Sequence, residues 1–417
     1  MTNAMSPRRY YIEPLGCPKN QVDSDKLAGT LVAEGMAPVG APDGADLVVV
    51  NTCAFIEEAR QESVDTILAL ADAKLSDARL VVTGCLAERY GTELADALPE
   101  ADAVVGFGVP VAVTAKPGRP VPEMDLLNLP RPKASAPWAY VKVAEGCDRA
   151  CGFCAIPSFR GQQRSRSMAA ILDEVDALGV QEVVLVAQDL ASYGRDQGRG
   201  ERAIVPLVGE VAGRVPCVRR LYLYPSDLTD ALIDVICDTG VPYFDLSLQH
   251  VSPPLLRRMR RWGHGAKFLA RIADIRRRQP DAAFRSNFIV GYPGETEGDH
   301  DQLLRFIDAA QLDWCGFFAY SEEAGTYSVG LDGKVPRSVV DERLAELRAL
   351  QDTITASRRD ALLGARVEVL VDAPGEGRSH REAPEIDGVI HVPDTLPAGT
   401  FASLVVTGAA GPDLEAA

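Results

Sequence analysis

The stretch YVKVAEGCDRACGFC, residues 140–154, places three cysteines on one short loop directly after an apolar run. Cys147, Cys151 and Cys154 follow one another at the spacing C-x3-C-x2-C. Three thiolates can hold three corners of a cubane iron–sulfur cluster and leave the fourth iron open to a ligand. A structural zinc site would need a fourth protein ligand, and the nearest histidine is His250. The loop therefore favours an open cluster, with zinc or inert thiols as the alternatives.

This loop opens a long region in which apolar, strand-like runs alternate with helical patterns. We expect strands at 140–146, 182–188, 220–224, 243–249, 284–290 and 314–320. Such alternation is typical of parallel β/α units, and six units are too few for a closed eightfold barrel. The pattern predicts a partial (β/α)6 barrel over residues 133–363, with its chemistry at the carboxyl ends of the strands.

The region before this barrel repeats the strand–helix pattern on a smaller scale. We expect strands at 9–16, 45–52, 78–84 and 101–106. Buried apolar runs of this length separated by helices predict a small parallel α/β domain over residues 8–120. Seven prolines between Pro110 and Pro137 mark the connection to the barrel.

Each of the first three of these strands is followed by a cysteine: Cys17, Cys53 and Cys85. The carboxyl ends of parallel strands lie along one edge of a sheet, about 5 Å apart between neighbours. We therefore expect the three thiols to meet at that edge, either as ligands of a second open cluster or as buried free thiols.

Residues 365–417 contain short strand patterns separated by turns with Gly and Pro, which predicts a small β-barrel. The final stretch, GAAGPDLEAA, is a weak pattern for the last strand. The segment has three arginines against nine acidic residues, a net charge of −6. A barrel that binds nucleic acid presents a basic face, so an acidic one favours a basic protein partner, with solubility as the alternative.

The whole chain is acidic too, with a net charge of −16 over 417 residues. That charge makes a bare phosphate backbone a less favourable partner. No apolar run has the length of a signal peptide or a membrane span, so we expect a cytoplasmic protein with no membrane association. In a reducing compartment nine cysteines indicate metal binding or catalysis rather than disulfides, and Cys217, Cys237 and Cys315 are expected to be core residues.

The C-x3-C-x2-C loop after the first barrel strand resembles the signature of the radical S-adenosylmethionine (SAM) superfamily. The following IPSFRG (156–161) and the later GYPGE (291–295) and SEEAGT (321–326) resemble its methylthiotransferase branch, and the tail resembles a TRAM domain. The resemblance covers essentially the whole chain. It implies SAM and two 4Fe–4S clusters as cofactors, with SAM cleaved reductively to a 5′-deoxyadenosyl radical at Cys147, Cys151 and Cys154, and sulfur carried or activated at Cys17, Cys53 and Cys85.

The same resemblance implies which side chains lie near SAM. It places Gln188, Gln249 and Arg285 there, with Arg285 as the partner of the SAM carboxylate. For each of them, a hydrogen-bonded polar group at a strand end is the alternative. His250 is the one histidine near the expected barrel mouth and a weaker candidate for a substrate-side role.

Two motifs bear on the substrate. GCPKN (16–20) and APEIDG (383–388) resemble the branch that methylthiolates the β-carbon of an aspartate in small-subunit ribosomal protein S-twelve. The alternative branch acts on a tRNA adenosine beside the anticodon. A remote alternative is an iron–sulfur electron carrier or scaffold. Either transferase would need an external electron donor.

Overall fold

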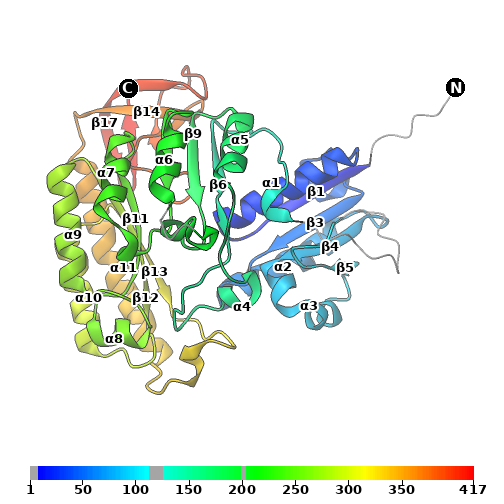
Figure 1. The fold of residues 1–417 in the computed structure, drawn as a ribbon, viewed down its shortest axis with the longest axis horizontal. Helices are drawn as coiled ribbons and strands as arrows, with labels where there is room; N and C mark the ends of the chain where they lie inside the picture. Colours follow the sequence, from blue (N-terminus) through cyan, green and yellow to red (C-terminus); the bar gives the residue numbers. More distant parts are fainter. Residues whose placement is uncertain (1–7, 112–124, 199–202) are drawn as a thin grey trace. The chain divides into compact units, whose positions relative to one another are not determined.

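The computed structural model describes residues 8–111, 125–198 and 203–417 (Figure 1). The chain divides into two compact units. The first consists of residues 1–133, 145–148 and 155–166, and the second of residues 134–144, 149–154 and 167–417. The expected end of the first domain, at residue 120, lies outside the described residues.

The first unit contains a parallel five-stranded sheet in the order β2-β1-β3-β4-β5. Its strands are β1 (Arg9–Pro14), β2 (Ala37–Pro38), β3 (Leu47–Thr52), β4 (Arg79–Gly84) and β5 (Ala103–Val104). The sequence predicted all but β2, a two-residue edge strand that ends in proline and is too short to show a pattern. Chain order reverses between β1 and β3, which makes the carboxyl ends of these two strands a topological switch point, the usual ligand site of such sheets.

Helices cover both faces of this sheet. They are α1 (Pro18–Ala33), α2 (Glu57–Ala73), α3 (Cys85–Ala97) and the short α4 (Ile156–Arg160). Because side chains alternate along a strand, Val48 and Val50 of β3 pack with Ile67 of α2, while Leu47 and Val49 pack with the other core. Leu27 and Leu31 of α1 belong to that second core. Both faces of β3 are therefore buried, as its continuous apolar run predicts.

The second unit is built on six parallel strands, the partial barrel that the sequence predicted. They are β6 (Trp138–Lys142), β9 (Glu182–Val186), β10 (Cys217–Arg220), β11 (Tyr243–Gln249), β12 (Ala283–Val290) and β13 (Trp314–Ala319). They form two three-stranded sheets, β6-β9-β10 and β11-β12-β13, which a parallel bridge between Leu223 and Leu246 joins.

The third of these strands begins earlier than predicted. The sequence indicated 220–224, whereas β10 is Cys217–Arg220. Tyr222 adopts a φ of 66°, which no extended strand allows, and its N–H donates to the Asp245 carboxylate at 2.9 Å. Leu221, Leu223 and Tyr224 of this apolar run are buried, but the run leaves the regular ladder at Tyr222.

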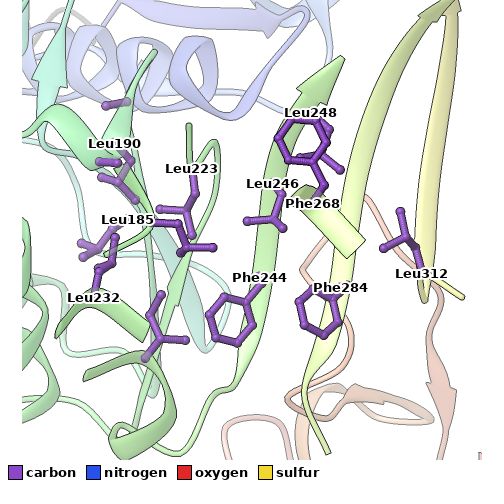
Figure 2. Close-up of a cluster of buried hydrophobic side chains, with 14 of the residues drawn as sticks. Leu185, Leu190, Leu223, Leu232, Phe244, Leu246, Leu248, Phe268, Phe284 and Leu312 are labelled. Atoms are coloured by element: carbon purple, nitrogen blue, oxygen red, sulfur yellow. The ribbon is translucent and has the colours of Figure 1, made fainter. Parts of the chain in front are cut away.

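In the described part of the second unit, seven α-helices pack around the six strands. They are α5 (Met168–Leu178), α6 (Ile204–Ala212), α7 (Asp230–Asp238), α8 (Pro253–Arg258), α9 (Gly265–Arg278), α10 (Glu297–Ala310) and α11 (Arg337–Asp360). Figure 2 shows part of the core, where Phe244 of β11 and Phe284 of β12 stack with ring centroids 5.4 Å apart. The helix predicted from Val340, Leu344, Leu347 and Ile354 is α11, and all four side chains are buried.

The tail forms a closed five-stranded barrel in the order β14-β15-β16-β18-β17. Its strands are β14 (Arg366–Ala373), β15 (Glu376–Arg378), β16 (Ile390–His391), β17 (Phe401–Ala410) and β18 (Asp413–Ala416). The weak final stretch supplies β18, which pairs with both β16 and β17 and closes the barrel. Two further short strands are β7 (Ala144–Glu145) and β8 (Arg164–Ser165).

A loop of this small barrel, residues 378–388, contacts the amino ends of the six-stranded barrel. Glu182, Tyr243 and Trp314 are the first residues of β9, β11 and β13. Glu182 accepts from Arg378 at 2.8 Å, Tyr243 donates to Asp387 at 2.6 Å, and Trp314 donates to the Arg381 carbonyl at 2.7 Å. The loop therefore covers the amino ends of these strands. Among the residues that the structure describes, no helix is both long enough and apolar enough to cross a membrane.

Candidate functional site

Three cysteines gather at the carboxyl edge of the first unit's sheet. Cys17 lies at the N-cap of α1 after β1, Cys53 directly follows β3, and Cys85 directly follows β4. The approach of the loops is close, since a Cβ atom on Gly16 would lie 2.8 Å from the Cys53 Sγ. Gly16 has a φ of +89°, so both its backbone conformation and its missing side chain are required there. The structure thus brings Cys17, Cys53 and Cys85 together.

Asn20, the last residue of GCPKN, ties the ends of these strands to one another. Its Nδ2 donates to the carbonyl oxygens of Leu15 and Thr52, each at 2.9 Å, which bridges the ends of β1 and β3. Its Oδ1 accepts from the Cys85 thiol at 3.5 Å. Ser63 of α2 exchanges hydrogen bonds with the backbone N–H and carbonyl of Cys53, both at 3.1 Å. The backbone around the thiols is therefore held before any ligand binds.

The three thiols influence one another electrostatically. Burial, followed by the charges of Cys17 and Cys85, raises the pKa of Cys53 to about 12. Burial also raises the pKa of Cys85. For Cys17, burial opposes ionisation, but Lys19, Arg160 and the backbone N–H groups at the start of α1 outweigh it and lower its pKa. Three thiolates at this edge thus need a cationic partner.

Arg160 of α4 supplies one cation to this edge. Its Nη1 pairs with Asp23 at 3.0 Å and Glu145 at 2.9 Å, while its Nη2 donates to the Asn20 Oδ1 at 2.5 Å and the Cys85 Sγ at 3.1 Å. The guanidinium lies 4.3 Å from the centroid of the Phe107 ring, and its side chain is only 3% exposed. Burial alone would lower the Arg160 pKa, but Glu145, Cys85, Asp23 and Cys17 raise it well above its ordinary value.

The second set of cysteines lies on the loop that the sequence singled out. Cys147 belongs to the first unit, and Cys151 and Cys154 belong to the second. Arg261 donates to the Cys151 Sγ at 3.2 Å, and Gly152 donates its N–H to the Met259 carbonyl at 2.8 Å. No larger residue fits at Gly152, where a Cβ would lie 2.9 Å from the Tyr292 hydroxyl.

Arg149, between the first two cysteines of the loop, anchors it to the ends of two barrel strands. Its Nε pairs with Asp189 at 2.6 Å, its Nη2 pairs with Asp227, and its guanidinium lies 3.9 Å from the Tyr224 ring centroid. Arg261 stacks on the same ring at 4.3 Å. These anchors hold Cys151 and Cys154 at the carboxyl ends of the strands.

The donor chemistry at both places fits an open iron–sulfur cluster. Each set offers three sulfur ligands, and bound iron would neutralise thiolates that burial, followed by the charges of Cys17 and Cys85, disfavours at Cys53. Across residues 8–111, 125–198 and 203–417, no three His, Cys, Asp or Glu side chains are placed to hold a single metal ion. A cubane does not need that convergence, because it distributes its ligands over different irons.

The three side chains expected near SAM fall into two groups. Gln188 lies just beyond β9, and Gln249 ends β11 with a φ of 69°, so both lie at carboxyl ends of strands, half-buried. Arg285 lies near the start of β12 and pairs with Asp245 at 3.6 Å and Asp387 at 3.3 Å. These two carboxylates occupy Arg285 near the amino ends of the strands, and the structure does not support it as the partner of SAM.

His250 is a core residue in this fold. Its side chain is fully buried, and its Nδ1 accepts from the Ser252 backbone N–H at 3.1 Å. Burial lowers the pKa of the imidazole to about 4. A substrate-side role needs access that His250 lacks here. Of the three remaining cysteines, Cys237 and Cys315 pack against the core as predicted, and Cys217 begins β10.

Sequence reasoning missed Asn20, Arg160 and Arg261. The first two lie inside motifs already quoted, GCPKN and IPSFRG, so a motif residue without an assigned role was the available signal. Arg261 lies in MRRWGH, an arginine-rich run that reads as an ordinary solvated helix end. Its proximity to Cys151, 110 positions away, comes only from the fold.

Comparison with known proteins agrees with this geometry. Family models match residues 9–106 (the family described as UPF0004), 141–307 (Radical SAM superfamily) and 363–417 (TRAM domain). The "Ribosomal protein uS12 methylthiotransferase RimO" of Kineococcus radiotolerans is 42% identical over 98% of this chain and 97% of its own length. Its namesake from Moorella thermoacetica is 43% identical over 96% of each chain. The chain belongs to the RimO family.

A solved radical SAM methyltransferase, TsrM from Kitasatospora setae, is 13% identical, with a TM-score of 0.49 over 84% of this chain and 89% of that one. In this RimO-family chain the first matched region contains Cys17, Cys53 and Cys85, and the second contains the Cys147–Cys154 loop. The third is the closed β-barrel. The chain is thus a radical SAM methylthiotransferase by family, with both cysteine sets present.

Proposed function

We propose that this enzyme methylthiolates the β-carbon of an aspartate in ribosomal protein uS12, which is small-subunit protein S-twelve. The observation that carries the proposal is the gathering of Cys17, Cys53 and Cys85 at one sheet edge in a chain that also has the C-x3-C-x2-C loop. Cleavage of SAM needs only the C-x3-C-x2-C loop. Sulfur insertion explains why the chain also has a second set of three cysteines. Kinship to RimO proteins over nearly the full length supports uS12 as the substrate.

Each cysteine set has its own role in this proposal. Cys147, Cys151 and Cys154 would hold the 4Fe–4S cluster that binds SAM, and Cys17, Cys53 and Cys85 would hold the auxiliary 4Fe–4S cluster. When bound, these cofactors supply the 5′-deoxyadenosyl radical, the sulfur and the methyl group. The amides of Gln188 and Gln249 would orient SAM, and their half-buried position at the carboxyl ends of β9 and β11 supports that role. An external donor supplies the electrons.

The remaining work of the chain is positioning. Arg149, paired with Asp189 and Asp227, fixes the loop that carries the first set of cysteines. Asn20 fixes the strand ends that carry the second set. The barrel loop 378–388 covers the amino ends of the strands, which leaves the carboxyl ends as the side where chemistry occurs.

The small barrel supports a basic partner, although fewer acids serve that purpose than the sequence suggested. Glu382 pairs with Arg359 and Asp387 with Arg285, so both carboxylates are consumed inside the unit. The exposed acids of the barrel are Glu368, Glu376, Glu385, Asp394 and Glu415. Arg366 is its one exposed arginine. An outer surface of this sign attracts a basic ribosomal protein and repels a phosphate backbone.

Substrate incubation tests the proposal. The reconstituted enzyme is given SAM, a reductant and either uS12 or tRNA, and both products are analysed by mass spectrometry. We expect a methylthio mass gain on an aspartate of uS12 and none on tRNA. A gain on tRNA alone would reverse the choice of substrate.

Two cysteine variants separate the proposed roles. Cys151→Ala should abolish formation of 5′-deoxyadenosine, because the loop loses a cluster ligand. Cys53→Ala should spare it and stop sulfur insertion. Equal loss of SAM cleavage in both variants would contradict the division of labour.

A further inference from the structure

Arg160 is one buried guanidinium that serves two groups of acceptors with two different nitrogens. Nη1 is paired with the carboxylates of Asp23 and Glu145. Nη2 faces the Asn20 amide oxygen and the Cys85 sulfur. Because the carboxylates hold the planar fork from one side, the guanidinium cannot turn away from Cys85 without breaking a buried ion pair.

An arginine in a buried ion pair is by itself only structural. Here, however, the donor to sulfur is charged: its Nη2 lies 3.1 Å from the Sγ of Cys85, which shares this sheet edge with Cys17 and Cys53. Hydrogen bonds to the cluster sulfurs and the net charge nearby are two of the quantities that set the reduction potential of an iron–sulfur cluster. A donor and a positive charge both stabilise the more negative, reduced state.

We propose that Arg160 is a positioning residue that sets the reduction potential of the cluster held by Cys17, Cys53 and Cys85. Its charge and its N–H···Sγ bond to Cys85 keep that cluster easier to reduce, and Asp23, a fully buried carboxylate paired with Arg160, opposes this effect. The inference rests on the proposed function, in which these cysteines hold the auxiliary cluster. It adds a control over the redox state from which sulfur is delivered.

The test isolates the auxiliary cluster in the full-length chain. The variant C147A/C151A/C154A removes the other cluster, and the remaining one is reconstituted and titrated electrochemically with detection by electron paramagnetic resonance. Arg160→Lys keeps a charge but cannot span the carboxylates and the sulfur as the planar fork does. We expect its reduced-to-oxidised ratio at a fixed poise to fall about tenfold, or about 59 mV for a one-electron couple.

Asp23→Asn provides the opposite perturbation with nearly the same shape. It removes one buried negative charge and leaves Arg160 beside Cys85, so the ratio should rise severalfold. Arg261→Lys is the matched control, because Arg261 contacts the cysteine set that is absent from this background, and it should leave the titration unchanged. If Arg160→Lys does not fold, the direction in which Asp23→Asn shifts the reduction potential still tests the proposal.

Each outcome has a distinct meaning. Opposite shifts in the Arg160 and Asp23 variants support the proposal. Unchanged potentials, or shifts of the same sign, with the cluster still bound overturn it and leave the proposed function intact. If the parent variant binds no iron at Cys17, Cys53 and Cys85 after reconstitution, the proposed function and this inference fail together.

Discussion

Glu182 offers a direct test of how the small barrel is joined to the six-stranded barrel. Its carboxylate is 2% exposed and accepts from Arg219 at 2.7 Å and Arg378 at 2.8 Å. Glu182→Gln keeps the shape of the side chain and removes the charge that two buried guanidiniums share. Removing one partner of a buried ion pair costs about 3–5 kcal/mol, since the other charge stays buried without compensation.

The cost should lie at the lower end of that range. Arg378 keeps its pair with Asp372 at 2.6 Å, and Arg219 keeps two carbonyl acceptors at 2.8 and 3.1 Å. We therefore expect the free energy of unfolding to fall by about 3 kcal/mol, measured by urea denaturation with circular dichroism at pH 7.5. The control is Glu210→Gln, an exposed partner of Arg214 at i,i+4, which should cost about 0.5 kcal/mol or less.

The pH dependence of unfolding gives a second test of the Glu182 ion pairs. Burial opposes ionisation of Glu182, but Arg219 and Arg378 outweigh it and lower the Glu182 pKa below its ordinary value. The stabilisation by the carboxylate is therefore complete above the unfolded pKa of about 4.3 and is lost as the pH falls through the lower folded pKa. The free energies of unfolding of the wild type and Glu182→Gln should differ by a constant amount above about pH 5 and become equal in acid. Equal costs for Glu182→Gln and Glu210→Gln at pH 7.5 would refute the reasoning.

Three further changes test the site and the core. Gly16→Ala should lower the amount of iron bound at Cys17, Cys53 and Cys85, because the new Cβ would lie 2.7 Å from the Cβ of Cys53. The control Gly35→Ala, at φ +84° with open space around it, should cost about 1–2 kcal/mol of strain and leave the iron content unchanged. Equal iron content in the two variants would contradict this packing. Phe284→Ala should lower the free energy of unfolding by about 3–5 kcal/mol, because Phe284 is fully buried, whereas Phe318→Ala, at an exposed position, should lower it by about 0.5 kcal/mol or less. Comparable denaturation midpoints for the two variants would contradict this. His250 should stay neutral from pH 8 to 5 in NMR titrations, because burial lowers its pKa to about 4, and a midpoint above pH 6 would show that the ring reaches solvent.

Much of the fold follows from periodicity. Strand-like runs predicted β1, β3, β4, β5 and five of the six barrel strands. The signal is plainest in β3 and β4, where nearly every side chain is buried and the run is therefore almost wholly apolar. The strand predicted at 220–224 was misplaced, because an apolar run can be buried without being extended, and the backbone of Tyr222 departs from the strand conformation. The edge strand β2 has two residues and carries no period at all.

In the candidate site, too, the sequence predicted some features and not others. The position of a cysteine after a strand predicted which thiols meet, since topology brings strand ends to one edge. Charge partners could not be predicted, because each depends on where distant loops fold. Arg285 illustrates this: only the fold brings Asp387, 102 positions away, into contact with it. The net charge of the tail likewise overstated its acidic surface, since Glu382 and Asp387 point inward.

The central claim is that two separate sets of cysteines each hold a cluster, and metal analysis tests it most directly. Iron and acid-labile sulfide are measured in anaerobically purified protein and in the two triple-alanine variants, C17A/C53A/C85A and C147A/C151A/C154A. Two cubanes predict about eight iron and eight sulfide per chain in the wild type and about half of each in either variant. Full iron retention in C17A/C53A/C85A, or a wild type with a single cluster, would contradict the account.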